Sequence, residues 1–214
     1  MKAWRILIAL IACLGPALQY GLMLEGETLA TGAAKSVEFF SYFTILSNML
    51  AAVALTAPLV APGSALGRWG ERSSTGIAIA VYLFVTAVIY HTLLAHLWDP
   101  RGWRFVSDTI LHTATPALFL LDWLLRGGEG PARWNAAPKA LAFPTLYGAW
   151  TLLHGAVSGF YPYPFLDVAK RGYPGVVVTL LVMAAGFLVV ALAFTALHQA
   201  RAALADRRTA PIST

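Results

Sequence analysis

Six apolar stretches, each close to the length of a membrane-spanning helix, are the feature that most restricts how this chain can fold. The hydrocarbon core of a bilayer is about 30 Å thick, so a helix needs roughly 20 apolar residues to cross it. The stretches cover residues 4–23, 37–60, 74–97, 106–125, 139–158 and 173–199. The connections between them are too short for a separate soluble domain. The pattern predicts an all-α polytopic membrane protein, a bundle of six transmembrane helices.

The composition agrees with a membrane location. Hydrophobic residues make up 58% of the 214 residues and charged residues 12%, with a mean hydropathy of +0.68, which is too apolar for an ordinary soluble domain. Residues 1–199 are predicted to form a single transmembrane domain, and residues 200–214 a basic cytoplasmic tail that is partly disordered. The first stretch follows Lys2 and Arg5 as in a signal peptide, but it lacks a small-residue cleavage site, so we expect a retained helix.

Lysine and arginine indicate the orientation, because cytoplasmic flanks retain positive charge. With both termini in the cytoplasm, the basic residues on that side are Lys2, Arg5, Arg68, Arg72, Arg126, Arg133, Lys139, Arg201, Arg207 and Arg208. Those facing outward are only Lys35, Arg101, Arg104, Lys170 and Arg171. We therefore expect cytoplasmic termini, and an even number of spans agrees because it puts both ends on the same side. The net charge of +5 follows from this topology, and no nucleic-acid partner is expected, because the basic residues form no run.

A single cysteine, Cys13, lies in the first stretch. One cysteine excludes an internal disulfide bond and a cysteine-based metal site. No cofactor motif is present, and the oligomeric state is not indicated by the sequence.

Polar side chains recur inside the apolar stretches, where lipid tolerates them only with a partner or beside a cavity. The motif FTILSN, residues 43–48, places Thr44, Ser47 and Asn48 at i, i+3 and i+4 on one helical face. Ser47 suits packing best. The other stretches contribute His91, His112 and His154, with Tyr90 beside the first. Counted from the predicted helix ends, these groups form one layer in the outer half of the membrane.

Each of these side chains also has an ordinary structural interpretation. The Thr44 hydroxyl can bond the carbonyl one turn back, at Phe40. Asn48 can donate to an oxyanion or simply join two helices. Asp108 precedes His112 by one turn, where its carboxylate either orients the imidazole or is an early helical residue favoured by the dipole.

The histidines leave a metal site open as an alternative. If His91, His112 and His154 converge with Asp108, they can hold zinc, which accepts imidazole and carboxylate ligands. The sequence has no HExxH motif and no helical pair of histidines four residues apart, so this signal is weak. Haem ligands that carry electrons across a membrane lie at two depths, whereas these histidines lie at one.

The segment YPYPFLD, residues 161–167, follows the fifth stretch. Its two prolines exclude a regular helix, and its alternating aromatic residues, Tyr161 and Tyr163 among them, are typical of the membrane interface. We expect it either to belong to this aromatic belt or to form a lip over the outer mouth of the bundle, where both tyrosines would contact a substrate.

Three motifs together resemble a known family. FTILSN, the block LHTATPALFLLDW at residues 111–123, and YPYPFLD resemble the Pr6Pr branch of the androgen-induced, FAR-17a-like integral membrane proteins. The resemblance covers nearly the whole chain. It implies hydrolysis of fatty acid esters of hydroxy fatty acids by a threonine in the second span and a histidine in the fourth, which are Thr44 and His112 here. Pro116 stands closer to His112 than in the animal pattern. The alanine-rich chain resembles bacterial relatives more closely, so we expect a protein of the bacterial cytoplasmic membrane that acts on another lipid ester.

The resulting hypothesis is an intramembrane lipid ester hydrolase. Thr44 would accept the acyl group while His112 takes its proton, and Asn48 is the first choice of oxyanion donor, with Tyr90 or His154 behind it. Two rivals remain open. One is a zinc-dependent hydrolase that uses the three histidines, and the other is a non-enzymatic protein that binds or transports lipid.

Overall fold

Every regular element of the protein, as far as the structure describes it, is a helix. The computed structural model describes residues 2–126 and 132–209, and the predicted all-α class is confirmed. The α-helices are α1 Lys2–Leu24, α2 Leu29–Phe39, α3 Phe43–Val60, α4 Ala65–Glu71, α5 Ser73–Ile89, α6 Trp103–Thr109, α7 Thr115–Arg126, α8 Ala136–Lys139, α9 Ala142–Ser158 and α10 Val168–Thr209. Two π-helical turns, η1 Tyr90–Leu94 and η3 Ile110–Ala114, extend α5 and join α6 to α7. Short 3₁₀ turns are η2 Ala95–Leu97 and η4 Pro164–Leu166.

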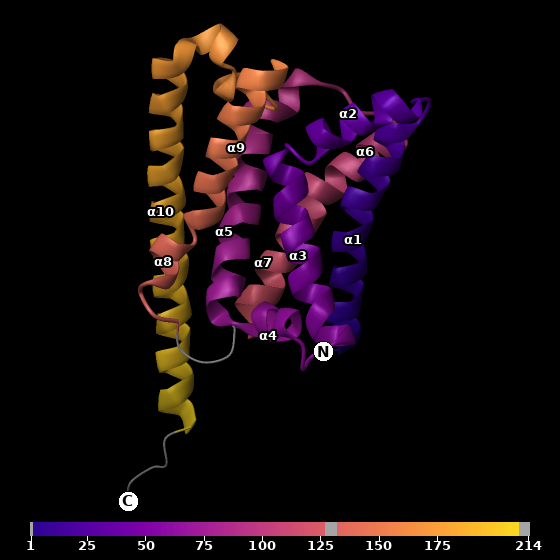
Figure 1. Ribbon diagram of the computed structural model, residues 1–214. Coiled ribbons are helices and arrows are strands. Elements are labelled where there is room, and N and C mark those ends of the chain that lie inside the picture. The colour runs from indigo at the N-terminus through magenta and orange to yellow at the C-terminus, as the bar shows by residue number, and fades with distance from the viewer. Residues whose placement is uncertain (1, 127–131, 210–214) are drawn as a thin grey trace, which may run out of the picture.

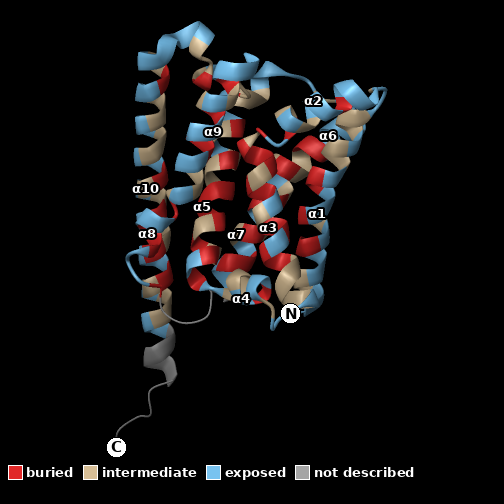
Figure 2. Ribbon diagram, in the orientation of Figure 1, coloured by how far each residue is buried: buried red, intermediate tan, exposed pale blue. Residues whose placement is uncertain are grey.

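The long helices run side by side as a bundle (Figure 1). Helices α3, α5 and α7 occupy its centre, where the buried residues concentrate, and α1 and α10 flank it (Figure 2). Helix α2 lies across the end that is uppermost in Figure 1, which we call the upper end, and α4 lies at the lower end. The start of α1 and the far end of α10 are both at the lower end.

Within residues 2–126 and 132–209, four segments are long and apolar enough to cross a membrane, namely Lys2–Leu24, Phe43–Val60, Ser73–Leu97 and Val168–Leu204. The other two predicted spans correspond to the run α6, η3 and α7 and to α9. Helix α9 has 17 residues and is about 25 Å long at 1.5 Å per residue, slightly less than the hydrocarbon core. The six-span count and the cytoplasmic placement of the termini therefore stay predictions.

The second predicted span, 37–60, is wrong at its start. The helix is interrupted at residues 40–42, and α3 begins at Phe43. The buried Ser41 is bound from α9, since the Tyr147 hydroxyl donates to its carbonyl over 3.0 Å and the Trp150 indole donates to its hydroxyl over 3.0 Å. Thr44 is thus the second residue of α3, and not seven residues inside a helix as its position in the sequence predicts. An apolar run hides such a break, because its hydropathy is the same whether or not the helix continues.

The last helix also exceeds its predicted range, 173–199. Helix α10 spans Val168–Thr209, with Gly172 in a non-helical conformation at φ +67° that other residues rarely adopt. The first ten residues of the predicted tail, 200–209, therefore continue the helix, and residues 210–214 lie outside the described residues.

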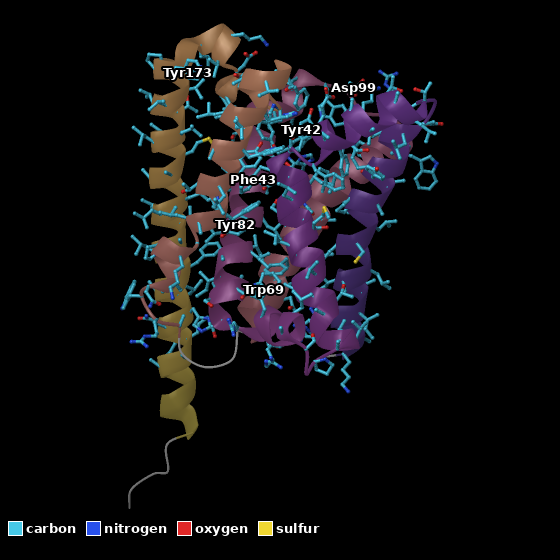
Figure 3. All side chains as sticks on the ribbon, viewed as in Figure 1. Tyr42, Phe43, Trp69, Tyr82, Asp99 and Tyr173 are labelled. Atoms are coloured by element: carbon cyan, nitrogen blue, oxygen red, sulfur yellow. The ribbon has the colours of Figure 1, made fainter. Side chains whose placement is uncertain are left out.

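An aromatic cluster joins four helices in the core. Phe43 lies 5.1 Å from Tyr147 and 5.5 Å from Phe187 between ring centroids, and Tyr82 lies 5.0 Å from Phe143. Figure 3 labels Tyr42, Phe43 and Tyr82 in descending order within the bundle. The cluster connects the start of α3 to α5, α9 and α10, and so fixes the surroundings of Thr44.

Gly155→Ala should destabilise the protein, although alanine favours a helix over glycine by about 1 kcal/mol. A Cβ atom at this position would lie 2.1 Å from a ring carbon of Tyr161. We expect a net loss of ~1–2 kcal/mol from overpacking, seen as a lower unfolding temperature in detergent. Gly186→Ala is the matched control, since a Cβ there meets nothing within 4 Å. Equal stability of the two variants would contradict this packing.

Candidate functional site

Thr44 sits at the buried start of α3, where its polar groups are bound by one phenol. Its N–H donates to the Tyr163 hydroxyl oxygen over 3.3 Å, and its own hydroxyl lies 3.4 Å from the same oxygen. The first N–H groups of a helix have no partner within the helix, so Tyr163 supplies one. Burial raises the pKa of Tyr163, which keeps the phenol neutral and able to donate a proton to a neighbouring oxygen.

An apolar cavity of about 460 Å³ opens beside Thr44. Its walls come from the start of α3, from α5, α9 and α10, and from the segment at Tyr163. Hydroxyl groups enter this wall only at Thr44, Thr86, Thr145, Tyr147 and Tyr163 among the described residues. A volume of this size and a mainly apolar lining are typical of small-molecule sites, and here they favour an apolar ligand with one polar group.

Asn48 links the backbone of Thr44 to a second helix. Its amide donates to the Thr44 carbonyl over 2.8 Å and to the Leu111 carbonyl over 3.1 Å. In the π-helical turn η3 each N–H bonds the carbonyl five residues back, as Thr115 does to Ile110. Pro116 has no N–H, so the Leu111 carbonyl lacks that partner and Asn48 replaces it. Both N–H groups of Asn48 are therefore occupied in this structure. Asn48 has no free N–H group for the oxyanion-donor role that the sequence predicted.

His112 lies one turn after Asp108 and is bound by the backbone carbonyl of that residue, so the orienting role predicted for the Asp108 carboxylate stays a prediction. The imidazole Nδ1 lies 3.1 Å from both the Asp108 carbonyl oxygen and its Oδ1. Of these two oxygens, only the backbone carbonyl is aligned for a hydrogen bond with Nδ1. The carboxylate Oδ1 is buried and has no aligned hydrogen-bond partner among the described residues. A carbonyl only accepts, so Nδ1 carries a proton and, in the neutral ring, Nε2 has the free lone pair.

Tyr90 completes this group. Its hydroxyl donates to the other carboxylate oxygen of Asp108, and its ring stacks on His112 at 3.7 Å between centroids and 11° between planes. Tyr90 and His112 lie in the two π-helical turns, η1 and η3, a conformation that is frequent at functional sites. The imidazole is thus held by one hydrogen bond and one face contact.

The two candidate catalytic residues lie on linked elements without a direct hydrogen bond in the described part of the chain. Thr44 is bound by Tyr163 and His112 by Asp108, and His112 is not part of the cavity wall. Their connection runs through Asn48, which bonds the backbone of Thr44 and of Leu111, the residue before His112.

The other two histidines lie in separate surroundings. His91 Nε2 is 3.0 Å from the Thr113 hydroxyl, and His154 Nδ1 is 3.5 Å from the Ser41 hydroxyl. No group of three histidine, cysteine or carboxylate side chains is close enough to hold a metal within residues 2–126 and 132–209. The convergence of His91, His112 and His154 that the zinc alternative requires is therefore wrong. Each imidazole faces a different neighbour, because each helix is rotated differently about its own axis.

The remaining predicted residues have packing partners. The Ser47 hydroxyl donates to the Thr44 carbonyl over 3.1 Å and lies 3.3 Å from the Thr86 hydroxyl. Tyr161 packs against Gly155, so of the two tyrosines in its segment only Tyr163 contacts Thr44.

The sequence reasoning missed the α9 residues Tyr147 and Trp150, which bind Ser41 and so position the start of α3. A signal for them exists, because Tyr147, Trp150 and His154 follow at helical spacing along one face of an apolar stretch. Polar atoms repeated on one face of a membrane helix indicate a partner on the neighbouring helix.

The fold and site define an all-helical integral membrane protein with a polar helix start beside an apolar cavity. The chain belongs to the FAR-17a/AIG1-like protein family, whose sequence profile matches residues 25–199. The resemblance to the androgen-induced, FAR-17a-like proteins is thereby confirmed. No curated protein and no solved structure matches the chain. Membership in this family is compatible with a membrane hydrolase.

Asn48→Leu should destabilise the protein by ~1–3 kcal/mol, because it leaves the buried Leu111 carbonyl without its donor. The measurement is the unfolding temperature in detergent. Ser47→Ala is the matched control on the same helix and should cost less, since the Ser47 hydroxyl serves a carbonyl that Asn48 also binds. A smaller loss for Asn48→Leu than for Ser47→Ala would refute the link.

Proposed function

We propose that the protein is an intramembrane hydrolase of lipid esters, with Thr44 as nucleophile and His112 as base. The observation that carries the proposal is the buried Thr44 hydroxyl in the wall of an apolar cavity of about 460 Å³. Such a site would accept an apolar chain and present its ester group to one hydroxyl. Membership in the FAR-17a/AIG1-like family supports the same reaction class. We place the upper end of the bundle on the outer face of a bacterial cytoplasmic membrane.

Acyl transfer to Thr44 is the first half of the proposed reaction. The Thr44 oxygen attacks the ester carbonyl carbon as its proton passes to Nε2 of His112. Collapse of the tetrahedral adduct breaks the bond to the alcohol oxygen, which takes the proton from His112 and leaves. In the second half a water molecule gives its proton to His112 and attacks the acyl-threonine. The acid is released, and the proton returns to the Thr44 oxygen, so one ester and one water yield one acid and one alcohol.

The oxyanion of the adduct needs hydrogen-bond donors near Thr44. The Thr44 N–H donates to the Tyr163 hydroxyl oxygen over 3.3 Å, and a substrate carbonyl oxygen that displaces the phenol oxygen from this N–H would accept from both groups. Asn48 cannot serve in the same way, because its N–H groups bond two backbone carbonyls. We therefore assign the oxyanion site to Thr44 and Tyr163, and a structural role to Asn48.

His112 must reach the Thr44 proton during the reaction. In the resting structure the Thr44 hydroxyl neighbours Tyr163, so contact requires rotation of the threonine side chain or one bridging water. Catalytic hydrogen bonds often tighten only when substrate binds. Asp108 and Tyr90 hold the imidazole ready, with Nδ1 occupied and Nε2 left for the proton.

A protein that binds or transports lipid without hydrolysis is the second candidate. It is favoured by one observation, the absence of a direct Thr44 to His112 hydrogen bond in the described part of the chain. The two candidates differ in turnover, and the first experiment below separates them.

Thr44→Ala should abolish both hydrolysis of long-chain fatty acyl esters and labelling of the purified protein by a fluorophosphonate probe. His112→Ala should lower kcat by about 10² to 10⁴ through loss of the base. Ser47→Ala, which removes a buried hydroxyl one turn from Thr44, is the control and should retain labelling. Labelling that persists in Thr44→Ala would exclude Thr44 as nucleophile, and full turnover in His112→Ala would exclude the base.

Tyr163→Phe should lower kcat by about 10² to 10³, the usual effect of losing one oxyanion donor. KM should change less, because the ring still closes the cavity wall. Tyr173→Phe removes a hydroxyl from a half-exposed tyrosine on α10, labelled in Figure 3, and should leave both constants unchanged. Equal kinetics for the two variants would remove Tyr163 from the oxyanion site.

A further inference from the structure

The cavity beside Thr44 extends along α9 for much of that helix. Its α9 lining begins at Leu141, just before the helix, and ends at Leu152. Eleven residues of helix rise about 16 Å, and half of a hydrocarbon core is about 15 Å thick. The cavity thus has the length of one membrane leaflet, which is the space that an extended fatty acyl chain occupies.

The cavity also opens toward the lipid-facing surface of the bundle. Its lining includes Thr145 and Ala149 of α9 and Leu181 of α10, all of which are exposed, Leu181 by 66%. Only 17% of the most apolar stretch of α10 is buried, against 56% for α3. Most of this stretch of α10 is therefore exposed, and the exposed lining residues mark a window between α9 and α10.

Gly148 of α9 faces the side chain of Leu180 of α10 beside this window. A Cβ atom on Gly148 would lie 3.2 Å from a terminal methyl group of Leu180, and both residues line the cavity. The absence of a side chain at Gly148 therefore keeps the space between α9 and α10 open at this level.

We propose that the cavity is a channel for one acyl chain, which enters sideways from the bilayer through the window between α9 and α10, with Gly148 setting the clearance. This inference rests on the proposed function, because it takes the chain to belong to the ester that reacts at Thr44. The apolar walls receive the chain, and Phe43 and Phe187, 5.5 Å apart between ring centroids, close the wall toward the aromatic cluster. The ester then lies at Thr44 and Tyr163, the polar part of the wall.

The first experiment measures binding without turnover. Full-length Thr44→Ala protein in lipid nanodiscs is given a palmitoyl ester with a photoreactive group in its chain, and the crosslinked peptides are identified. Crosslinks should fall on the cavity-lining residues of α9 and α10, and should drop about tenfold, or about 1.4 kcal/mol in affinity, when Gly148→Leu is added. Gly186→Leu, in open space on α10, is the matched control and should leave them unchanged.

Leu181→Trp provides a second test, because it narrows the window from a lipid-exposed position that does not depend on close packing. It should reduce crosslinking in the same way if Gly148→Leu fails to fold. Crosslinks confined to other faces of the bundle, or equal in all variants, would overturn the channel.

Turnover separates this inference from the proposed function. With Thr44 intact, Gly148→Leu should lower the ratio of palmitoyl to butyryl ester hydrolysis about tenfold relative to Gly186→Leu. Crosslinking in the cavity without any hydrolysis would leave the channel standing and refute the hydrolase. Hydrolysis with an unchanged ratio of palmitoyl to butyryl ester turnover would leave the hydrolase standing and refute the channel.

Discussion

The structure depends on one constraint, that a backbone polar group outside the α-helical ladder must find another partner where lipid excludes water. The chain leaves the ladder at residues 40–42 and at the π-helical turns η1 and η3. At the first place, Tyr147 donates to the Ser41 carbonyl and Tyr163 accepts from the Thr44 N–H. At η3, Asn48 replaces the N–H that Pro116 lacks. The side chains that satisfy the displaced backbone are therefore the ones that surround Thr44.

These hydrogen bonds hold the backbone at the start of α3 in place. A fixed backbone at this position also suits the proposed ester hydrolysis. The carbonyl of Thr44 accepts from Asn48 and Ser47, and its N–H is bound by Tyr163. The Thr44 N–H and hydroxyl both meet Tyr163 beside a cavity and not in a packed layer, so in the proposed mechanism both can exchange this phenol for a ligand. Donors that are fixed before a substrate arrives need not reorganise during the reaction, which is the main source of electrostatic stabilisation in enzymes.

The sequence predicted well where the relevant contacts are local. The helical class follows from the length of the apolar stretches, and a spacing of one turn brings His112 to Asp108, although the imidazole bonds the backbone carbonyl of Asp108 and not the predicted carboxylate. The break before Phe43 was missed, because residues 39–43, FFSYF, contain no helix-breaking residue and its cause, Tyr147, lies far along the chain. The histidines were wrongly grouped for a related reason. Depth can be counted along a helix, but the direction in which His91 or His154 points depends on packing against other helices.

The separation of His112 from the cavity wall suggests an order of events at the site. A carbonyl that binds between the Thr44 N–H and the Tyr163 hydroxyl competes with the Thr44 hydroxyl for the same phenol. A hydroxyl displaced within an apolar cavity needs a new acceptor, since burying it unpaired costs free energy. Rotation about a single side-chain bond takes a threonine hydroxyl from one staggered position to another. In the proposed mechanism the displaced Thr44 hydroxyl rotates toward His112, whose free Nε2 accepts its hydrogen bond. The base therefore engages only after a substrate carbonyl has bound. In this proposed order the Thr44 hydroxyl would stay bonded to Tyr163, and unreactive, until an ester enters the cavity.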